Sequence, residues 1–264
     1  MKNILITILS FFALCLVLSV FIVRNNTVVK GQHYIAHAGG AIDGLSYTNC
    51  MEAVNNAISK GIVYIELDLC ITSDSVLVAA HDWAHFNKIT GYEGVDSAPR
   101  FEDFKTRKIH GKYTPISYID IVQILRAHPN IFLVTDKISD PDIIDKYFKE
   151  FKPRLCVECF SIEDYLELSG KGYYLPMLSF VPSKQLVKDY VKDIMFSSSF
   201  PNFFCCHNIS FEQMYNSKNK YYYLSKIIQA QYSIYNSFFS GRLYADSIFQ
   251  NYPDVKFIYV DDIE

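Results

Sequence analysis

The feature that most constrains the fold of this chain is a regular alternation of short apolar runs with stretches of helical spacing. Strands that alternate with helices of about 10–15 residues form parallel βαβ units. The expected strands cover residues 33–37, 62–71, 76–80, 130–137, 154–160, 173–180, 200–207 and 231–236, and residues 240–253 and 255–262 close the chain. The expected helices cover residues 49–61, 117–128, 141–151, 161–172, 183–194 and 211–230.

Seven or eight such units in a chain of this length predict an α/β protein with a compact (β/α)8 TIM barrel. An open doubly wound sheet is the alternative, but no glycine-rich nucleotide fingerprint follows any strand. Residues 31–264 contain no linker and no repeat, so we expect one domain. Half of the chain is hydrophobic and the net charge is −3, without a basic block, which argues against nucleic acid as a partner.

The N-terminal segment, residues 1–30, stands apart from the rest of the chain. Residues 4–23 carry no charge and are long enough to cross a bilayer. No small-x-small cleavage site follows, so we expect an uncleaved single-pass membrane anchor, with a cleaved signal peptide as the alternative. The flanking charges nearly balance, and we expect the barrel to lie outside the cytoplasm because a single N-terminal anchor more often leaves its domain there.

Two carboxylates, Glu66 and Asp68, stand in the middle of the apolar segment IVYIELDLCI. Residues two apart on a strand share a face, so both side chains should point the same way. Burying two carboxylates together is costly unless a cation neutralises them, and Ca²⁺ or Mg²⁺ suits oxygen ligands best. The pair therefore indicates a site for one divalent cation. The alternative is that one carboxylate forms a salt bridge and the other faces water.

Further polar residues end neighbouring apolar runs. His37 follows HYIA, His81 follows VLVAA and Asp136 follows IFLVT. Catalytic groups of a (β/α)8 barrel project from the carboxyl ends of its strands, and histidine exchanges protons near neutral pH. A hydrogen-bonded core position is the alternative for either histidine alone. Trp83 and His85, just beyond His81, are expected either to line the mouth of a substrate site or to pack within their loop.

The cysteines offer one competing metal site. Cys156 and Cys159 have the spacing of a zinc pair and could be joined by Cys205, Cys206 or His207. However, RLCVECF has the pattern of a strand, which would point Cys156 and Cys159 to opposite faces. We therefore expect structural cysteines rather than a zinc site.

The segment from 37 to 91 resembles the glycerophosphodiester phosphodiesterases, within the wider group of phosphatidylinositol-phospholipase-C-like barrels. The motifs that carry the resemblance are HAGG at 37–40, YTNCMEA at 47–53, GIVYIELDLCITSDSVLVAAHD at 61–82 and FNKITG at 86–91. The match over 61–82 is dense and contains the residues expected to do chemistry. Weaker similarity continues through KYTPISYIDIVQIL, CVECFSIEDYLEL and the closing VKFIYVDD.

The resemblance implies a metal-dependent phosphodiesterase on a (β/α)8 barrel, expected to act on a glycerophosphodiester, a phospholipid headgroup or a phosphodiester-decorated surface glycan. His37 and His81 would be the general acid and base. Glu66 and Asp68 would bind the cation, with Asp136 as the third ligand and Glu158 as its substitute. Asn49, Lys137 and Trp83 would contact the substrate.

Two departures from the family pattern bear on activity. The family's arginine after the first histidine is Ala38 here, and the glutamate before Asn49 is Thr48. The loss of a bidentate phosphate donor at residue 38 leaves open a barrel that binds phosphodiester or glycan ligands without turnover. A further alternative is an envelope scaffold whose carboxylate pair is only structural. The sequence predicts no oligomeric state.

Overall fold

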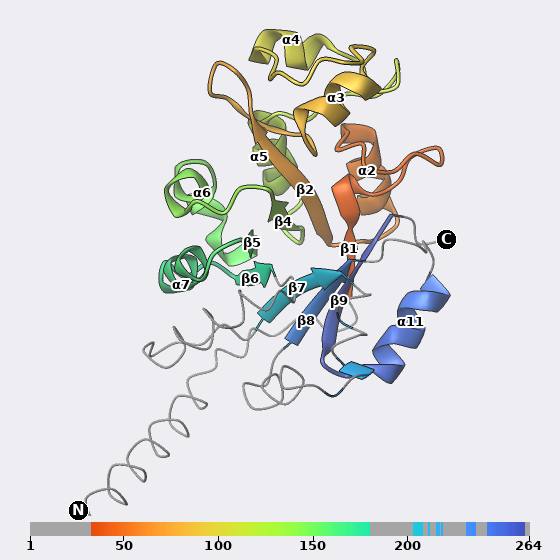
Figure 1. The fold of residues 1–264 in the computed structure, drawn as a ribbon, viewed down its shortest axis with the longest axis vertical. Coiled ribbons are helices and arrows are strands. Elements are labelled where there is room, and N and C mark those ends of the chain that lie inside the picture. Colours follow the sequence, from red (N-terminus) through yellow and green to blue (C-terminus); the bar gives the residue numbers. More distant parts are fainter. Residues whose placement is uncertain are drawn as a thin grey trace, which may run out of the picture.

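The computed structural model describes residues 33–179, 203–207, 211, 215–216, 218, 231–235 and 242–261 (Figure 1). Eight parallel strands form a closed barrel, because β1 pairs with β9 on one side and with β2 on the other. In barrel order the strands are β1 (Tyr34–Ala36), β2 (Tyr64–Ile71), β4 (Phe132–Asp136), β5 (Leu155–Cys159), β6 (Leu175–Ser179), β7 (Phe203–His207), β8 (Gln231–Tyr235) and β9 (Val255–Val260). The predicted TIM-barrel fold is confirmed.

One expected strand lies outside the barrel. The run at 76–80 forms β3 (Leu77–Ala79), which pairs antiparallel with the end of β2 across the tight turn at 72–76. Two short helices that the sequence did not predict follow it, α3 (Trp83–Ile89) and α4 (Phe101–Thr106). Figure 1 shows these helices at one end of the molecule, beside the β2–β3 hairpin.

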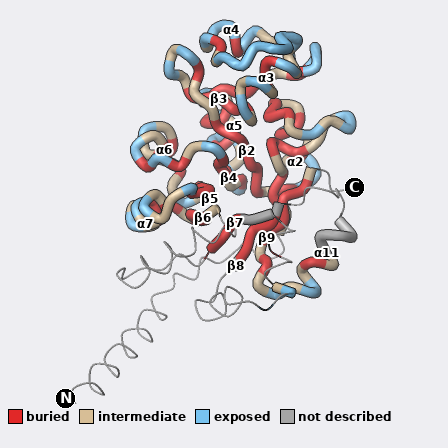
Figure 2. The backbone as a smooth tube through the Cα atoms, in the orientation of Figure 1, coloured by how far each residue is buried: buried red, intermediate tan, exposed pale blue. Residues whose placement is uncertain are grey.

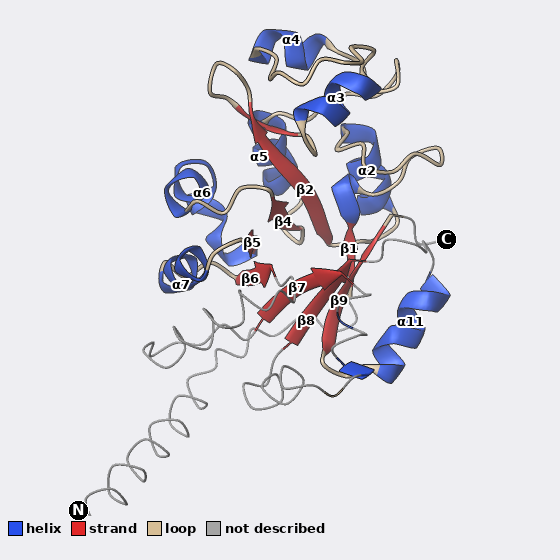
Figure 3. Ribbon diagram, viewed as in Figure 1, coloured by secondary structure: helices blue, strands red, loops and turns tan. Residues whose placement is uncertain are grey.

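Helices follow most of the described strands and pack outside the barrel (Figure 3). They are α2 (Met51–Ser59), α5 (Tyr118–Ala127), α6 (Pro141–Phe148), α7 (Ile162–Gly170) and α11 (Arg242–Asn251), with the 3-10 helices η1 (His37–Gly39) and η2 (Lys149–Arg154). Ser117 caps α5 in a reciprocal capping box with Asp120, which explains why this helix begins where the sequence predicts. The expected helices at 183–194 and over most of 211–230 lie outside the described residues.

The core has two layers because successive residues of a strand face opposite sides of the barrel wall. On β2, Tyr64 belongs to the cluster that fills the barrel, whereas Ile65, Leu67 and Leu69 pack against the surrounding helices. Figure 2 shows this buried wall as a continuous red region, with exposed positions gathered on the outer helices. Tyr64, Phe257 and Tyr259 are each at most 2% exposed, so the barrel interior is filled by side chains.

The two cysteines of the possible zinc pair separate as the strand pattern predicts. Cys156 lies in the interior cluster, and Cys159 lies in the outer layer against the helices. Within the described residues, no cysteine joins a group of side chains that could hold a metal ion.

The expected membrane segment, residues 4–23, lies outside the described part of the chain. None of the described helices has the length and apolar character needed to span a membrane.

Candidate active site

The alternation that builds the barrel interior also assembles its polar end. On several strands, the last interior apolar residue is followed, two positions later, by a polar residue. Tyr64 precedes Glu66 and then Asp68 on β2, and Val134 precedes Asp136 on β4. By the same spacing, Ile35 leads to His37, Cys156 to Glu158 and Tyr259 to Asp261. The carboxyl ends of the strands therefore carry a cluster of ionisable groups directly above the apolar interior.

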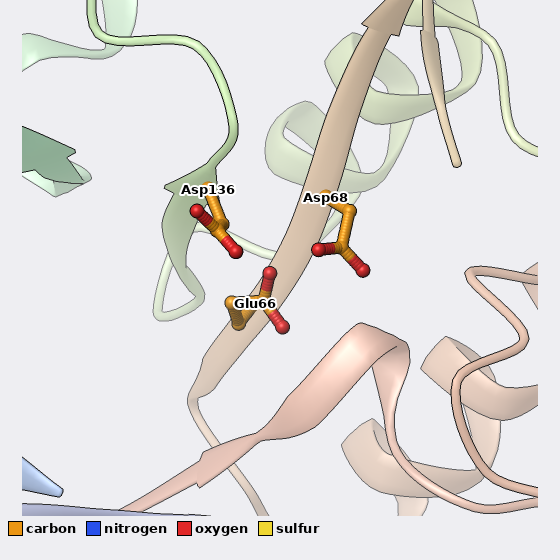
Figure 4. Close-up of side chains that lie close together, drawn as sticks. All are labelled: Glu66, Asp68 and Asp136. Atoms are coloured by element: carbon orange, nitrogen blue, oxygen red, sulfur yellow. The ribbon is translucent and has the colours of Figure 1, made fainter. Parts of the chain in front are cut away.

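Three of these carboxylates form the centre of the site. Glu66, Asp68 and Asp136 are buried and offer oxygens that all lie within 4.8 Å of one another. Asp68 and Asp136 are direct partners in the parallel register of β2 and β4. Figure 4 shows the carboxylate of Asp136 directed at the pair on β2. We call these three residues the carboxylate triad.

Local backbone geometry explains how adjacent residues Asp136 and Lys137 both reach the site. In an unbroken strand they would face opposite sides, but Lys137 has a φ of +70°, which is left-handed and outside strand geometry. Its Nζ consequently lies 2.9 Å from Asp136 Oδ2 and 3.5 Å from Asp68 Oδ1. Glu158, the sequence's substitute for Asp136, lies on β5 and is not part of the triad.

Glu66 is the most deeply buried carboxylate of the three. Its side chain is fully buried, and burial raises its pKa well above the usual range, with further increases from the charges of Asp68 and Asp136. The backbone N–H of Ala38 donates to Oε2 at 2.6 Å. No described residue hydrogen-bonds to Oε1, which is also buried. Burial likewise raises the pKa of Asp136, although the adjacent Lys137 opposes the increase.

Asn49 fixes the position of Asp68. The Asn49 amide donates to Asp68 Oδ2 at 2.8 Å, and its carbonyl oxygen accepts the Asp68 backbone N–H at 3.0 Å. Asn49 is itself left-handed, with a φ of +48°, and Ala38 has a φ of +46°. Non-glycine residues in this region are strained, and such strain often accumulates at functional sites. Asn49, which the sequence predicts to contact the substrate, thus holds a carboxylate of the triad in place.

The triad has the chemistry of a divalent cation site. All of its donors are carboxylate oxygens, which hard cations such as Ca²⁺ and Mg²⁺ prefer. The orphan Oε1 of Glu66 adds a specific observation, since a buried carboxylate oxygen without a partner is costly unless a ligand satisfies it. The residues present therefore fit a divalent cation.

Each predicted catalytic histidine is oriented by a carboxylate. His37 Nδ1 lies 3.1 Å from Asp261 Oδ1, and His81 Nδ1 lies 2.6 Å from Asp82 Oδ2. Because an ionised carboxylate only accepts hydrogen bonds, Nδ1 of each ring carries a proton. Burial opposes ionisation of Asp82, but hydrogen bonds from the His85 backbone and from His81 lower its pKa overall. Asp82 also caps the N-terminus of α3, which fixes it in place.

Aromatic rings link the two histidines. The ring of Tyr47 lies edge-on to His37 at 4.5 Å and to His81 at 5.9 Å between centroids. The ring of His85 in turn lies 5.9 Å from His81. His37 and His81 therefore belong to one connected face of the molecule.

Trp83 makes a different set of contacts. Its ring packs edge-on against Phe86 at 6.1 Å and Phe104 at 6.4 Å, within the small core beneath α3 and α4. These contacts correspond to the loop-packing alternative, and a substrate contact for Trp83 stays a prediction.

Three residues of this face were not predicted from the sequence, namely Tyr47, Asp82 and Asp261, whereas His85 was expected at the mouth of the site or within its loop. Two of them carried a usable signal. Asp82 directly follows His81 at the start of a helix, and Asp261 falls two residues after the interior Tyr259. Tyr47 reaches the site through a left-handed backbone conformation that no periodicity predicts.

Comparisons with known proteins agree with this geometry. The model of the glycerophosphoryl diester phosphodiesterase family matches residues 37–169, which is half of the chain. No functionally curated protein matches the chain.

Solved structures with the same fold include a glycerophosphodiester phosphodiesterase from Agrobacterium tumefaciens. It has a TM-score of 0.60 and 16% identity, over 87% of this chain and 96% of that one. A glycerophosphoryl diester phosphodiesterase from Parabacteroides distasonis has a TM-score of 0.56 and 16% identity, over 89% and 85%. A phosphodiesterase from Oleispira antarctica, in complex with the product sn-glycerol-3-phosphate, has a TM-score of 0.59 and 13% identity, over 86% and 92%. At these identities the likeness concerns the fold.

Proposed function

This chain is a phosphodiesterase of the glycerophosphoryl diester phosphodiesterase family, and we propose that it cleaves small glycerophosphodiesters with one divalent cation and two histidines. The observation that carries the proposal is the buried carboxylate triad with its unpartnered Glu66 oxygen. A family match without such a site would have supported a non-catalytic barrel, since fold alone does not give function.

Glu66, Asp68 and Asp136 would hold the cation. When bound, a divalent cation supplies charge that polarises a phosphoryl oxygen and offsets the charge that develops during transfer. The protein prepares this site in advance, because Asn49 restrains Asp68 and the Ala38 N–H restrains Glu66. Lys137 adds a positive charge at the same place and would contact the phosphoryl group.

The two histidines would move the protons. With Nδ1 protonated toward Asp261 or Asp82, the lone pair of each neutral ring lies on Nε2. The neutral ring that acts as base accepts the proton of the attacking hydroxyl, from water or from the substrate itself, on Nε2. The other ring acts as acid in its imidazolium form and donates its Nε2 proton to the leaving alcohol. Asp261 and Asp82 hold each ring in the required tautomer and stabilise the imidazolium that forms.

The substrate class follows from the site and from the relatives. The Oleispira relative holds sn-glycerol-3-phosphate, a product with one small alcohol on phosphate. With a divalent cation bound, the triad and Lys137 would suit a compact anionic diester, such as a glycerophosphodiester or a phospholipid headgroup.

We also propose that residues 1–30 anchor the barrel at a membrane with the active site outside the cytoplasm. The support is the uncharged run at 4–23. A reporter enzyme that is active only outside the cytoplasm, fused after residue 264, tests the orientation. Activity of the reporter agrees with the proposal, and its inactivity contradicts it.

The two-histidine mechanism is tested with the full chain, glycerophosphocholine and the variants His37→Ala, His81→Ala and Asp261→Asn. We expect either histidine variant to lose at least about a hundredfold in kcat, the scale of general acid–base catalysis. Asp261→Asn should lose activity while it still binds the cation by calorimetry. Full activity of His81→Ala would eliminate the mechanism, and His128→Ala, remote from the triad, is the control.

A further inference from the structure

Tyr47 occupies an unusual backbone conformation beside the triad. Its φ is +57°, in the left-handed region that a bulky aromatic residue rarely adopts. Because this conformation is strained for a tyrosine, the surrounding structure must enforce it. A strained backbone conformation of this kind next to a catalytic centre indicates a functional role for the side chain.

Two hydrogen bonds enforce the conformation. The ring nitrogen Nε2 of His85 lies 3.1 Å from the Tyr47 carbonyl oxygen and donates to it. Two residues further on, the Asn49 N–H donates to the carbonyl oxygen of Ala38 at 3.0 Å. The segment that carries Tyr47 is therefore tied to α3 on one side and to the turn after His37 on the other.

The Tyr47 ring lies between the two catalytic histidines. It contacts His37 and His81 edge-on, at interplanar angles of 73° and 76°. A phosphodiester that exchanges protons with both histidines must pass through the space between them. Any substrate of this site therefore comes close to Tyr47.

The phenolic hydroxyl of Tyr47 is available as a hydrogen-bond donor. Burial raises the pKa of Tyr47, and the charges of Asp261, Asp68 and Glu66 raise it further, so the group remains a protonated donor at neutral pH. No described residue forms a hydrogen bond with this hydroxyl. The side chain is only partly buried, which leaves the hydroxyl open to a ligand.

An anionic substrate at this site needs a hydrogen-bond donor besides Lys137 and the Ala38 N–H. Lys137 is the one cation that contacts the triad among the described residues, and its Nζ is already shared by Asp68 and Asp136. Ala38 supplies only its backbone N–H, which Glu66 accepts. The binding of an anionic diester beside these carboxylates is therefore strengthened most by a neutral hydrogen-bond donor that does not already donate to a carboxylate.

We propose that Tyr47 is a substrate-binding residue whose hydroxyl donates a hydrogen bond to the phosphodiester between His37 and His81. The inference rests on the proposed function for its ligand class, a phosphate ester, and assigns a new residue to it.

The test compares Tyr47→Phe with the wild-type full chain and with Tyr92→Phe. Phenylalanine removes only the hydroxyl and keeps the ring that contacts both histidines. Tyr92 is an exposed tyrosine that lies over Arg107, away from the triad, and serves as the matched control. Three quantities are measured in Ca²⁺: the Kd of sn-glycerol 3-phosphate by calorimetry, and kcat and KM for glycerophosphocholine.

A hydrogen bond to a charged ligand is worth about ten- to a hundredfold in binding. We expect Tyr47→Phe to weaken the binding of glycerol phosphate by that factor and to raise KM more than it lowers kcat, with cation affinity unchanged. Tyr92→Phe should match the wild type within about twofold. If the wild type binds glycerol phosphate tightly and Tyr47→Phe does not, the inference is supported. Absence of turnover by the wild type in the same experiment would count against the proposed function and not against the role of Tyr47. Equal Kd values for Tyr47→Phe and wild type, loss of cation binding in the variant, or no glycerol phosphate binding by the wild type would each overturn it.

Discussion

Asp136 on β4 lies directly opposite Asp68 on β2 in the register of the barrel, and this pairing decides which carboxylate completes the triad. Glu158 shares the interior face one strand further on and raises the pKa of Glu66 only as a minor contributor. The register thus selects Asp136 over Glu158.

Asp136→Asn should therefore weaken cation binding far more than Glu158→Gln. We expect a loss of roughly a hundredfold for Asp136→Asn, because one anionic ligand of three disappears, and less than about threefold for Glu158→Gln. Calorimetric titration of the full chain with Ca²⁺ and Mg²⁺ measures both. The reverse order of effects would place Glu158 in the site.

Glu66→Gln should stabilise the metal-free chain while it abolishes cation binding. A carboxyl group whose pKa is raised in the folded state binds its proton more tightly there than in the unfolded chain. Its ionisation therefore costs stability as pH rises above the unfolded pKa of about 4.3. Glutamine avoids this cost and can still accept the Ala38 N–H.

Thermal unfolding in EDTA at pH 7.5 measures this effect. We expect a Tm for Glu66→Gln that is a few degrees above the wild type, equivalent to ~1 kcal/mol or more. Glu93→Gln, at an exposed position, is the control. A lower Tm for Glu66→Gln than for Glu93→Gln would mean that the buried charge is already compensated in the metal-free chain.

Lys137→Met should strengthen cation binding and weaken substrate binding. The Lys137 ammonium contacts Asp68 and Asp136, so it competes with a cation for their oxygens and raises the electrostatic cost of placing one there. Its removal should tighten Ca²⁺ binding several-fold and raise KM for glycerophosphocholine by at least about tenfold. Calorimetry and steady-state kinetics on the same sample check both signs. Weaker Ca²⁺ binding in the variant would show that Lys137 supports the triad rather than opposing the cation.

Much of this architecture was predictable because it depends on period-two alternation. The strand around Glu66 and Asp68 was expected at 62–71 and is found at Tyr64–Ile71, with both carboxylates on one face. The spacing of such strands was enough to predict a closed barrel. The helix at 117–128 was equally clear, since its capping serine and apolar spacing agree.

The remaining features depend on contacts that a linear pattern does not contain. The left-handed backbone at Lys137 brings two adjacent side chains to one site, against the alternation rule that made Asp136 ambiguous. The pairing of His37 with Asp261 joins residues 224 positions apart. The packing of Trp83 against Phe86 and Phe104 likewise joins residues of α3 and α4 that no sequence period places together.

Acid stability should depend on Asp145, outside the active site. Asp145 accepts hydrogen bonds from Tyr173, Lys152 and Lys171, which lower its pKa to about 2. A carboxylate with a depressed folded pKa stabilises the fold above its unfolded pKa of about 3.9, and this contribution is lost as pH falls toward 2. Asp145→Asn should therefore lower stability at pH 7 by about 1 kcal/mol, a value reduced for partial exposure, and by less at pH 3.

Thermal unfolding at both pH values checks this prediction, with Asp142→Asn on the same helix as the control because its side chain is almost fully exposed. An equal loss of stability at pH 7 and pH 3 would show that charge is not the source of the effect.

The most direct measurement of the central claim is the release of choline or glycerol phosphate products from glycerophosphocholine by the full chain, with and without EDTA. We predict turnover that EDTA abolishes, that added Ca²⁺ or Mg²⁺ restores, and that Asp136→Asn lacks. Turnover that persists in EDTA and in Asp136→Asn would contradict a reaction built on the carboxylate triad.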